Sequence, residues 1–184
     1  TLNTSALAVG SHSLTAQYLG DSDFTTSTST SSSHTVNAAS TSTSVASAPN
    51  PSTFGQSVTI TATVAVSGAG SGTPTGSVEF FDGAASLGTA TLSGGSASIS
   101  TSALTTGSHS LTAVYAGVTS FSGSTSSAYT HTVSQASSSV SMSSSPNPSV
   151  VGESVTLSAS VTPRRSNRAR IISDASPCVG GGAL

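Results

Sequence analysis

The feature that most constrains this chain is a repeat of its own sequence at a distance of 97 residues. Residues 4–18 match residues 101–115, with Leu, Gly, His and Tyr all at equivalent positions. The same shift carries the motif at 49–52 onto 146–149, and no gap is needed between residues 4 and 65. A fixed period of this length is typical of modular repeats, in which each copy is one structural unit.

The period predicts four segments. Residues 39–135 are expected to be a complete unit, residues 1–38 the C-terminal part of a preceding unit, and residues 136–162 the N-terminal part of a following one. Residues 163–184 match nothing in the repeat, and we interpret them as a disordered tail or the product of a shifted reading frame. Both partial units are expected to expose unpaired strand edges.

Composition excludes several classes of partner. Ser and Thr occupy 74 of the 184 positions, and only 5% of the residues are charged. Residues 1–162 contain no Lys or Arg, so they cannot neutralise phosphates, and we expect no binding to nucleic acid or to anionic membranes. No apolar run approaches the roughly 20 residues that span a bilayer, so no membrane insertion is expected. Cys178 is the only cysteine, which rules out a disulfide within the chain.

Periodicity predicts an all-β fold. Residues 57–64 alternate apolar and Thr side chains with period two, which is typical of a half-buried strand. Similar patterns predict strands at 77–80, 87–92, 96–101, 110–115 and 128–133, with Gly94 and Gly95 in a hairpin turn. Seven or eight short strands in under 100 residues indicate an antiparallel sandwich. The expected core residues are Phe54, Val58, Ile60, Val64, Val78, Phe80, Leu92, Ile99, Leu104, Leu111, Tyr115 and Val133.

Several of these motifs resemble the bacterial Ig-like repeat family. They are the Pro-Asn-Pro-Ser segment at 49–52 with Gly-Gln-Ser-Val-Thr at 55–59, Gly-Thr-Pro-Thr-Gly-Ser-Val-Glu-Phe at 72–80, and Gly-Ser-His-Ser-Leu-Thr-Ala-Val-Tyr at 107–115. The resemblance covers residues 1–162. It implies an immunoglobulin-like β-sandwich that occurs in tandem on large secreted or surface-anchored bacterial proteins.

The same resemblance assigns structural roles to five residues. Leu104, Gly107, His109 and Leu111 are similar to a corner that in immunoglobulin domains carries a tyrosine and the second cysteine, and Tyr115 follows it on the same strand. His109 takes the tyrosine's place and Leu111 the cysteine's. The resemblance therefore implies a fold without a disulfide, whose two sheets are joined by apolar contact alone.

The candidates for chemistry are few. The four His residues form two equivalent pairs, and each unit offers too few ligands for zinc, so we expect structural roles, including a hydrogen bond from His109 to its own corner. Asp21 and Asp23 are a candidate calcium site, but their equivalents 97 residues later carry no carboxylate. A Ser-His-Asp triad lacks its usual sequence context, so no enzymatic activity and no cofactor is expected.

These observations leave three functions open. The first is a structural spacer or stalk, or part of an adhesin, located outside the cell or on its surface, whose partners are the neighbouring repeats of the same chain. The second is a module that binds carbohydrate or a host surface protein, with Phe81 and Tyr129 as exposed aromatic side chains by strand parity. The third is an accessory region of an extracellular enzyme.

Overall fold

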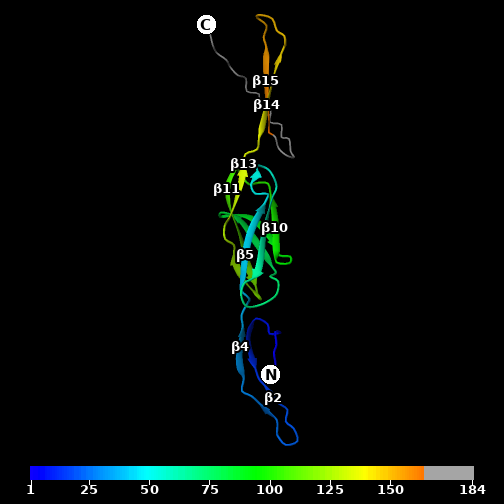
Figure 1. Ribbon diagram of the computed structural model, residues 1–184, viewed down its shortest axis with the longest axis vertical. Helices are drawn as coiled ribbons and strands as arrows, with labels where there is room; N and C mark the ends of the chain where they lie inside the picture. The colour runs from blue at the N-terminus through cyan, green and yellow to red at the C-terminus, as the bar shows by residue number, and fades with distance from the viewer. Residues whose placement is uncertain (164–184) are drawn as a thin grey trace.

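The computed structural model describes residues 1–163, which form fifteen β-strands and no helix. The strands are β1 (Gly10–Leu14), β2 (Gln17–Tyr18), β3 (Ser27–Thr28), β4 (Ser32–Val36), β5 (Thr41–Ala48), β6 (Ser52–Thr53), β7 (Val58–Val66), β8 (Ser77–Asp82), β9 (Ala85–Thr91), β10 (Ser96–Thr101), β11 (Gly107–Val118), β12 (Phe121–Thr125), β13 (Tyr129–Ser134), β14 (Ser138–Ser145) and β15 (Thr156–Pro163). Figure 1 shows a central body with short paired strands beyond each end, β1 to β4 on one side and β14 and β15 on the other. The expectation of an all-β fold is confirmed.

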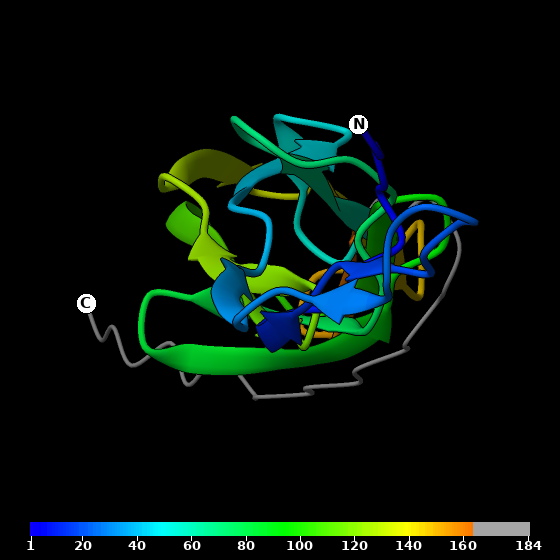
Figure 2. The ribbon, with the colours of Figure 1, turned by 90° about the horizontal axis from the view of Figure 1, so that it is seen from below.

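The body consists of two sheets that share one apolar core. One sheet has the order β10-β7-β5, and the other has the order β6-β13-β11-β8-β9, with β12 paired to β11. All neighbours pair antiparallel except β6 and β13, which are parallel. Figure 2 looks along the long axis, so that the strands of both sheets surround a common interior. We call this part, β5 to β13, the body.

Strict alternation explains how each sheet buries one face. In β7 the side chains of Val58, Ile60, Ala62 and Val64 are buried, and the Thr residues between them point outward. The other sheet supplies Val78, Phe80, Leu111, Ala113, Tyr115 and Val133 to the same cluster. The six strands predicted from periodicity are all present, and Gly94 and Gly95 form the expected turn with positive φ at both positions.

Two expectations about the body are wrong. Phe54 was expected in the core but is 38% exposed, because it follows the short strand β6 in a turn at the end of the body. Ile99 is only partly buried and packs against the core. The other expected core residues are buried.

The strand pairs outside the body repeat pairings within it. His12 pairs with His34 between β1 and β4, as His109 pairs with His131 between β11 and β13. The pairing of β2 with β3 matches that of β11 with β12, and the pairing of β14 with β15 matches that of β5 with β7, always at a shift of 97 residues. We call residues 1–38 the N-terminal flank and residues 136–163 the C-terminal flank. The predicted tail lies outside the described residues except for Pro163, which ends β15.

Candidate functional site

The most concentrated polar chemistry in the body is a histidine cluster near one end of the sandwiched strands. His109 on β11 and His131 on β13 are directly paired in register, with ring centroids 6.5 Å apart. Asp82 at the end of β8 reaches the first ring, and Ser47 on β5 and Ser52 on β6 reach the second. The cluster therefore joins five strands.

His109 is held between two hydrogen-bond acceptors. Its Nδ1 lies 2.6 Å from Asp82 Oδ2, and its Nε2 lies 2.8 Å from the carbonyl oxygen of Thr105. The expected hydrogen bond to its own corner is thus present. Both ring nitrogens can donate only when the ring is protonated. The pKa of His109 is accordingly raised, first by the bond to Thr105 and further by the Asp82 carboxylate, against the opposing effect of partial burial.

His131 is fully buried and bridges the two sheets. Its Nδ1 lies 2.8 Å from Ser47 Oγ, and its Nε2 lies 2.9 Å from Ser52 Oγ. A neutral ring satisfies both, because one nitrogen donates its N–H and the other accepts a hydroxyl hydrogen. Burial, and then the nearby His109, lower the pKa of His131. The neutral ring therefore connects β13, the last strand of the body, to β5 and β6, its first two. We call these two hydrogen bonds the His131 clasp.

This clasp corrects the expectation that apolar contact alone joins the sheets. Ser47 belongs to the sheet of β5 and His131 to the other sheet, so their hydrogen bond crosses between sheets. At the opposite end of β5, Thr41 and Thr43 place their Oγ1 atoms 2.7 Å from Ser124 Oγ on β12. Hydroxyl side chains thus hold β5 to the second sheet at both ends.

The cluster is not arranged as a catalytic triad. The hydroxyls of Ser47 and Ser52 that bond His131 are buried, and the Asp82 carboxylate bonds His109 instead of His131. No single histidine here therefore links a serine hydroxyl to a carboxylate, as a catalytic triad requires. Among residues 1–163, no group of three or more His, Cys, Asp or Glu side chains is placed to hold a metal ion. The geometry fits a structural role.

The calcium candidates form a local turn. Asp21 Oδ1 accepts hydrogen bonds from the backbone N–H groups of Asp23 and Phe24, both at 2.9 Å, and Oδ2 accepts one from the Tyr18 hydroxyl at 2.7 Å. These bonds lower the pKa of Asp21, with the Tyr18 hydroxyl as the largest cause. Both oxygens of Asp21 are therefore engaged within the loop.

The remaining corner residues lie where a structural role requires them. Leu104, Leu111 and Tyr115 are buried, and the Tyr115 hydroxyl donates to the carbonyl oxygen of Thr75 at 2.8 Å. Gly107 begins β11 with a φ of 133°, a conformation that side-chain-bearing residues rarely adopt. These four positions shape the corner into which His109 folds back.

The aromatic candidates do not form a joint binding surface. Phe81 points to the outer face of its sheet, opposite to buried Phe80, and is half-buried. Tyr129 shares the parity of buried His131 and packs against the core, so its expected exposure is wrong. Its hydroxyl accepts a hydrogen bond from Asn50 Nδ2 at 3.2 Å. The two rings lie on opposite faces of one sheet.

Sequence reasoning missed Ser47 and Ser52 as partners of a histidine. One signal was present but was not used: His131 has the same strand parity as Val133, an expected core residue, and a ring on that face needs polar partners. The identity of those partners was hidden, because they come from strands about 80 residues earlier in the chain.

Comparison with known proteins agrees with this fold. Residues 44–134 match the family model of the bacterial Ig-like domain, group 3. The chain therefore contains a bacterial Ig-like domain, and the resemblance noted in the sequence is confirmed for residues 44–134.

Two further comparisons assign no additional family to the chain. Fibronectin(III)-like modules of Clostridium thermocellum CbhA are similar at 19% identity and a TM-score of 0.36, over 64% of this chain. The match spans 62% of that chain, which is less than two thirds of its length. No curated protein sequence matches. The described residues include no helix long and apolar enough to cross a membrane.

Proposed function

We propose that this chain is a structural spacer, part of a stalk or adhesin on a secreted or surface-anchored bacterial repeat protein. The observation that carries the proposal is the repeated strand register: three separate pairings recur at a shift of 97 residues. In tandem repeats each unit contacts mainly its neighbours, so units add length while the fold stays the same. The partners in this role are neighbouring Ig-like units of the same chain.

Short connections between units support a semi-rigid stalk. β13 ends at Ser134 and β14 begins at Ser138, which leaves three residues between the body and the C-terminal flank. On the other side, the backbone N–H of Ala39 donates to Ser120 and the backbone N–H of Ser122 donates to Ala39, both at 2.9 Å. The segment that enters the body is therefore fastened to the hairpin of β11 and β12, which limits bending at that point.

The length added by each unit follows from its longest strand. β11 has 12 residues, which at about 3.3 Å per residue corresponds to roughly 40 Å. Since the N- and C-terminal flanks lie beyond opposite ends of the body (Figure 1), consecutive units extend the chain along one axis.

The surface suits a role outside the cell. Residues 1–163 carry no Lys or Arg and present Ser and Thr on the outward faces of their strands, a surface that stays hydrated and attracts few charged partners. The proposal assigns the chain no catalytic step and no cofactor. A module that binds carbohydrate or a host protein remains the competing hypothesis, and an accessory region of an extracellular enzyme is the next.

A concatemer experiment tests the spacer role. Chains of two, three and four copies of residues 39–135 are compared by small-angle X-ray scattering. The maximum dimension is expected to rise by a constant step, on the order of 40 Å per copy. A dimension that rises only as the cube root of mass would show collapsed units and contradict the proposal.

The competing hypothesis has its own test. The chain is applied to an array of glycans and of proteins from the surface of host cells. Saturable binding that is lost in Phe81→Ala would replace the spacer proposal with the binding module, whereas no saturable binding supports the spacer.

A further inference from the structure

Four residues between β4 and β5 form the linker through which the chain enters the body. Within it, Ala39 pairs in parallel with Phe121 and makes backbone hydrogen bonds to Ser120 and Ser122, both at 2.9 Å. Thr41, the first residue of β5, adds a hydrogen bond from its Oγ1 to the carbonyl oxygen of Ser122 at 2.7 Å. The hairpin of β11 and β12 thus holds one side of the linker.

The loop between β7 and β8, residues 67–76, covers another side of the linker. A Cβ atom added at Gly70 would lie 2.7 Å from the Cβ of Ala39, a distance too short for two carbon atoms that are not bonded to each other. Gly70 also has a φ of 121°, which side-chain-bearing residues rarely adopt. Only a glycine lets the loop approach the linker so closely. We use the name socket for the four residues that surround Ala39, which are Gly70, Ser120, Phe121 and Ser122.

The loop is fastened on both sides of Gly70. At its start, the backbone N–H of Ser67 donates to the carbonyl oxygen of Ser40 at 2.8 Å. Near its end, the carbonyl oxygen of Thr75 accepts a hydrogen bond from the hydroxyl of buried Tyr115, also at 2.8 Å. A methyl group added at Gly70 is therefore expected to displace the linker and to break the backbone hydrogen bonds of Ala39.

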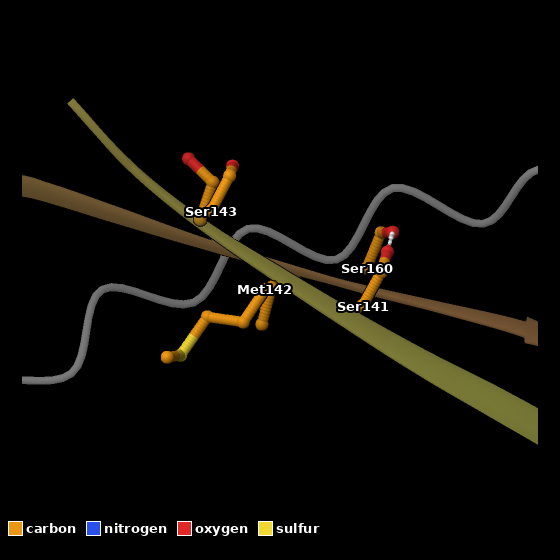
Figure 3. Close-up of a pocket in the computed structure, with 6 residues that line it drawn as sticks. Ser141, Met142, Ser143 and Ser160 are labelled. Carbon is orange, nitrogen blue, oxygen red and sulfur yellow. Dashed lines mark hydrogen bonds between the residues drawn. The ribbon is translucent and has the colours of Figure 1, made fainter. Parts of the chain in front are cut away.

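The exit from the body repeats the start of this linker. Ala136 stands 97 positions after Ala39, and the strand that follows it, β14, is the counterpart of β5. Figure 3 shows one pair of that ladder, in which Ser141 Oγ lies 2.7 Å from Ser160 Oγ on β15. The equivalents of these two serines are likewise directly opposite each other between β5 and β7. Ala39 therefore marks the position at which one unit passes into the next.

We propose that Gly70 is a positioning residue for the stalk, because it closes the socket over Ala39 and so fixes the direction in which each unit continues from the one before it. With the socket closed, consecutive units keep one relative orientation. With the socket open, the residues between them bend as a short flexible linker. The inference rests on the proposed spacer role and adds to it the contact that makes the stalk stiff.

Pulsed electron paramagnetic resonance measures the orientation of two complete units. The full chain is extended by repeating residues 39–135 once, so that a second Ala39 follows Gln135. Spin labels are attached in both units at Ser98→Cys, an exposed position of β10, after Cys178→Ser has removed the native thiol. A narrow distribution of distances between the two labels is expected. A broad distribution in this parent chain would overturn the proposal.

Two glycines of the same loop provide a matched comparison. Gly70→Ala in the second unit is expected to broaden the distance distribution at least about twofold, because the linker then flexes. Gly68→Ala is the control, since Gly68 also has a positive φ, 98°, but a Cβ added there meets no atom within 4 Å. It imposes a similar backbone strain and is expected to leave the width unchanged. If both variants broaden the distribution, or neither does, the proposal is wrong.

A double variant moves the methyl group across the contact. Ala39→Gly combined with Gly70→Ala in the second unit leaves one methyl group between the two positions, as in the natural sequence. The narrow distribution is therefore expected to return. A double variant as broad as Gly70→Ala alone would show that the clash with Ala39 is not the cause, and would overturn the proposal. Circular dichroism of each variant checks that the strands are intact.

The scattering experiment on concatemers separates this inference from the spacer role. Concatemers that lengthen by a constant step per copy, combined with equal widths for Gly70→Ala and the parent chain, would refute the socket alone. Collapsed concatemers would refute the spacer role itself. A constant step together with broadening in Gly70→Ala, and not in Gly68→Ala, is the result that supports both.

Discussion

Leu111 and Leu14 offer a matched pair of substitutions, because they occupy the same position of the repeat in different surroundings. Both follow the same Gly-Ser-His-Ser sequence on a strand that pairs with an equivalent partner strand. Leu111 is 0% exposed in the core of the body, whereas Leu14 is 43% exposed in the N-terminal flank. Any difference between Leu111→Ala and Leu14→Ala thus reports packing rather than local sequence.

The magnitudes follow from burial. Truncation of a fully buried Leu to Ala typically costs about 2–5 kcal/mol, the sum of lost transfer free energy and the cavity that remains. For a domain of this size, a loss of about 3 kcal/mol lowers Tm by roughly 12–24 °C. Leu14→Ala removes atoms that already contact water, so we expect a change within about 0.5 kcal/mol.

The assay is urea unfolding followed by far-UV circular dichroism, since the chain has no Trp. It is run at a few micromolar protein. Leu111→Ala is expected to lower the midpoint with an unchanged m value. Equal losses for the two variants would refute the reasoning, because they would place Leu14 in a core as well packed as that of Leu111.

Three further predictions concern polar groups. Stability should be greatest near pH 6.5, the ordinary pKa of His. Below pH 6.5 the unfolded chain binds a proton that buried His131 does not, and above pH 6.5 folded His109 binds a proton that the unfolded chain does not. The free energy of unfolding therefore falls on both sides, by at most about 1.4 kcal/mol per pH unit for each histidine. His109→Gln should abolish the decline above pH 6.5 in urea titrations, and persistence of that decline would contradict the assignment. Ser124→Ala should cost about 1–3 kcal/mol by removing its bonds to β5, while Ser27→Ala, at the equivalent flank position, should cost almost nothing in the same titrations. Calcium should leave the Tm of the chain unchanged in thermal melts, since both carboxylate oxygens of Asp21 already accept hydrogen bonds. A rise in Tm of several degrees would contradict this and indicate calcium binding.

Periodicity predicted the strands whose inward positions are apolar. β7 alternates Val, Ile and Ala with Thr, so the buried face could be read directly from its sequence. β5 was missed for a physical reason: its inward positions include Thr41, Thr43 and Ser47, which face the second sheet with hydroxyls instead of hydrocarbon. A polar strand of this kind shows no apolar alternation, and its position becomes clear only from its partners across the core.

In the histidine cluster, too, the local contact could be predicted from the sequence and the long-range contacts could not. The bond from His109 to its corner is local, within four residues, and the resemblance to the immunoglobulin corner predicted it. The clasp at His131 depends on residues about 80 positions away and on a crossing between sheets, which no local pattern specifies. Tyr129 was misplaced because its parity was assigned without the knowledge that His131, two residues later, faces inward.

Amide hydrogen exchange measured by mass spectrometry tests the central claim most directly, that residues 39–135 are one closed cooperative unit and the flanks are open copies of its two halves. At micromolar protein, amides of β7 and β11 are expected to exchange only through global unfolding, while those of β15 and β1, their equivalents at a shift of 97 residues, exchange rapidly, although β1 and β11 share the sequence Gly-Ser-His-Ser-Leu. Equal protection of the body and both flanks would contradict the account.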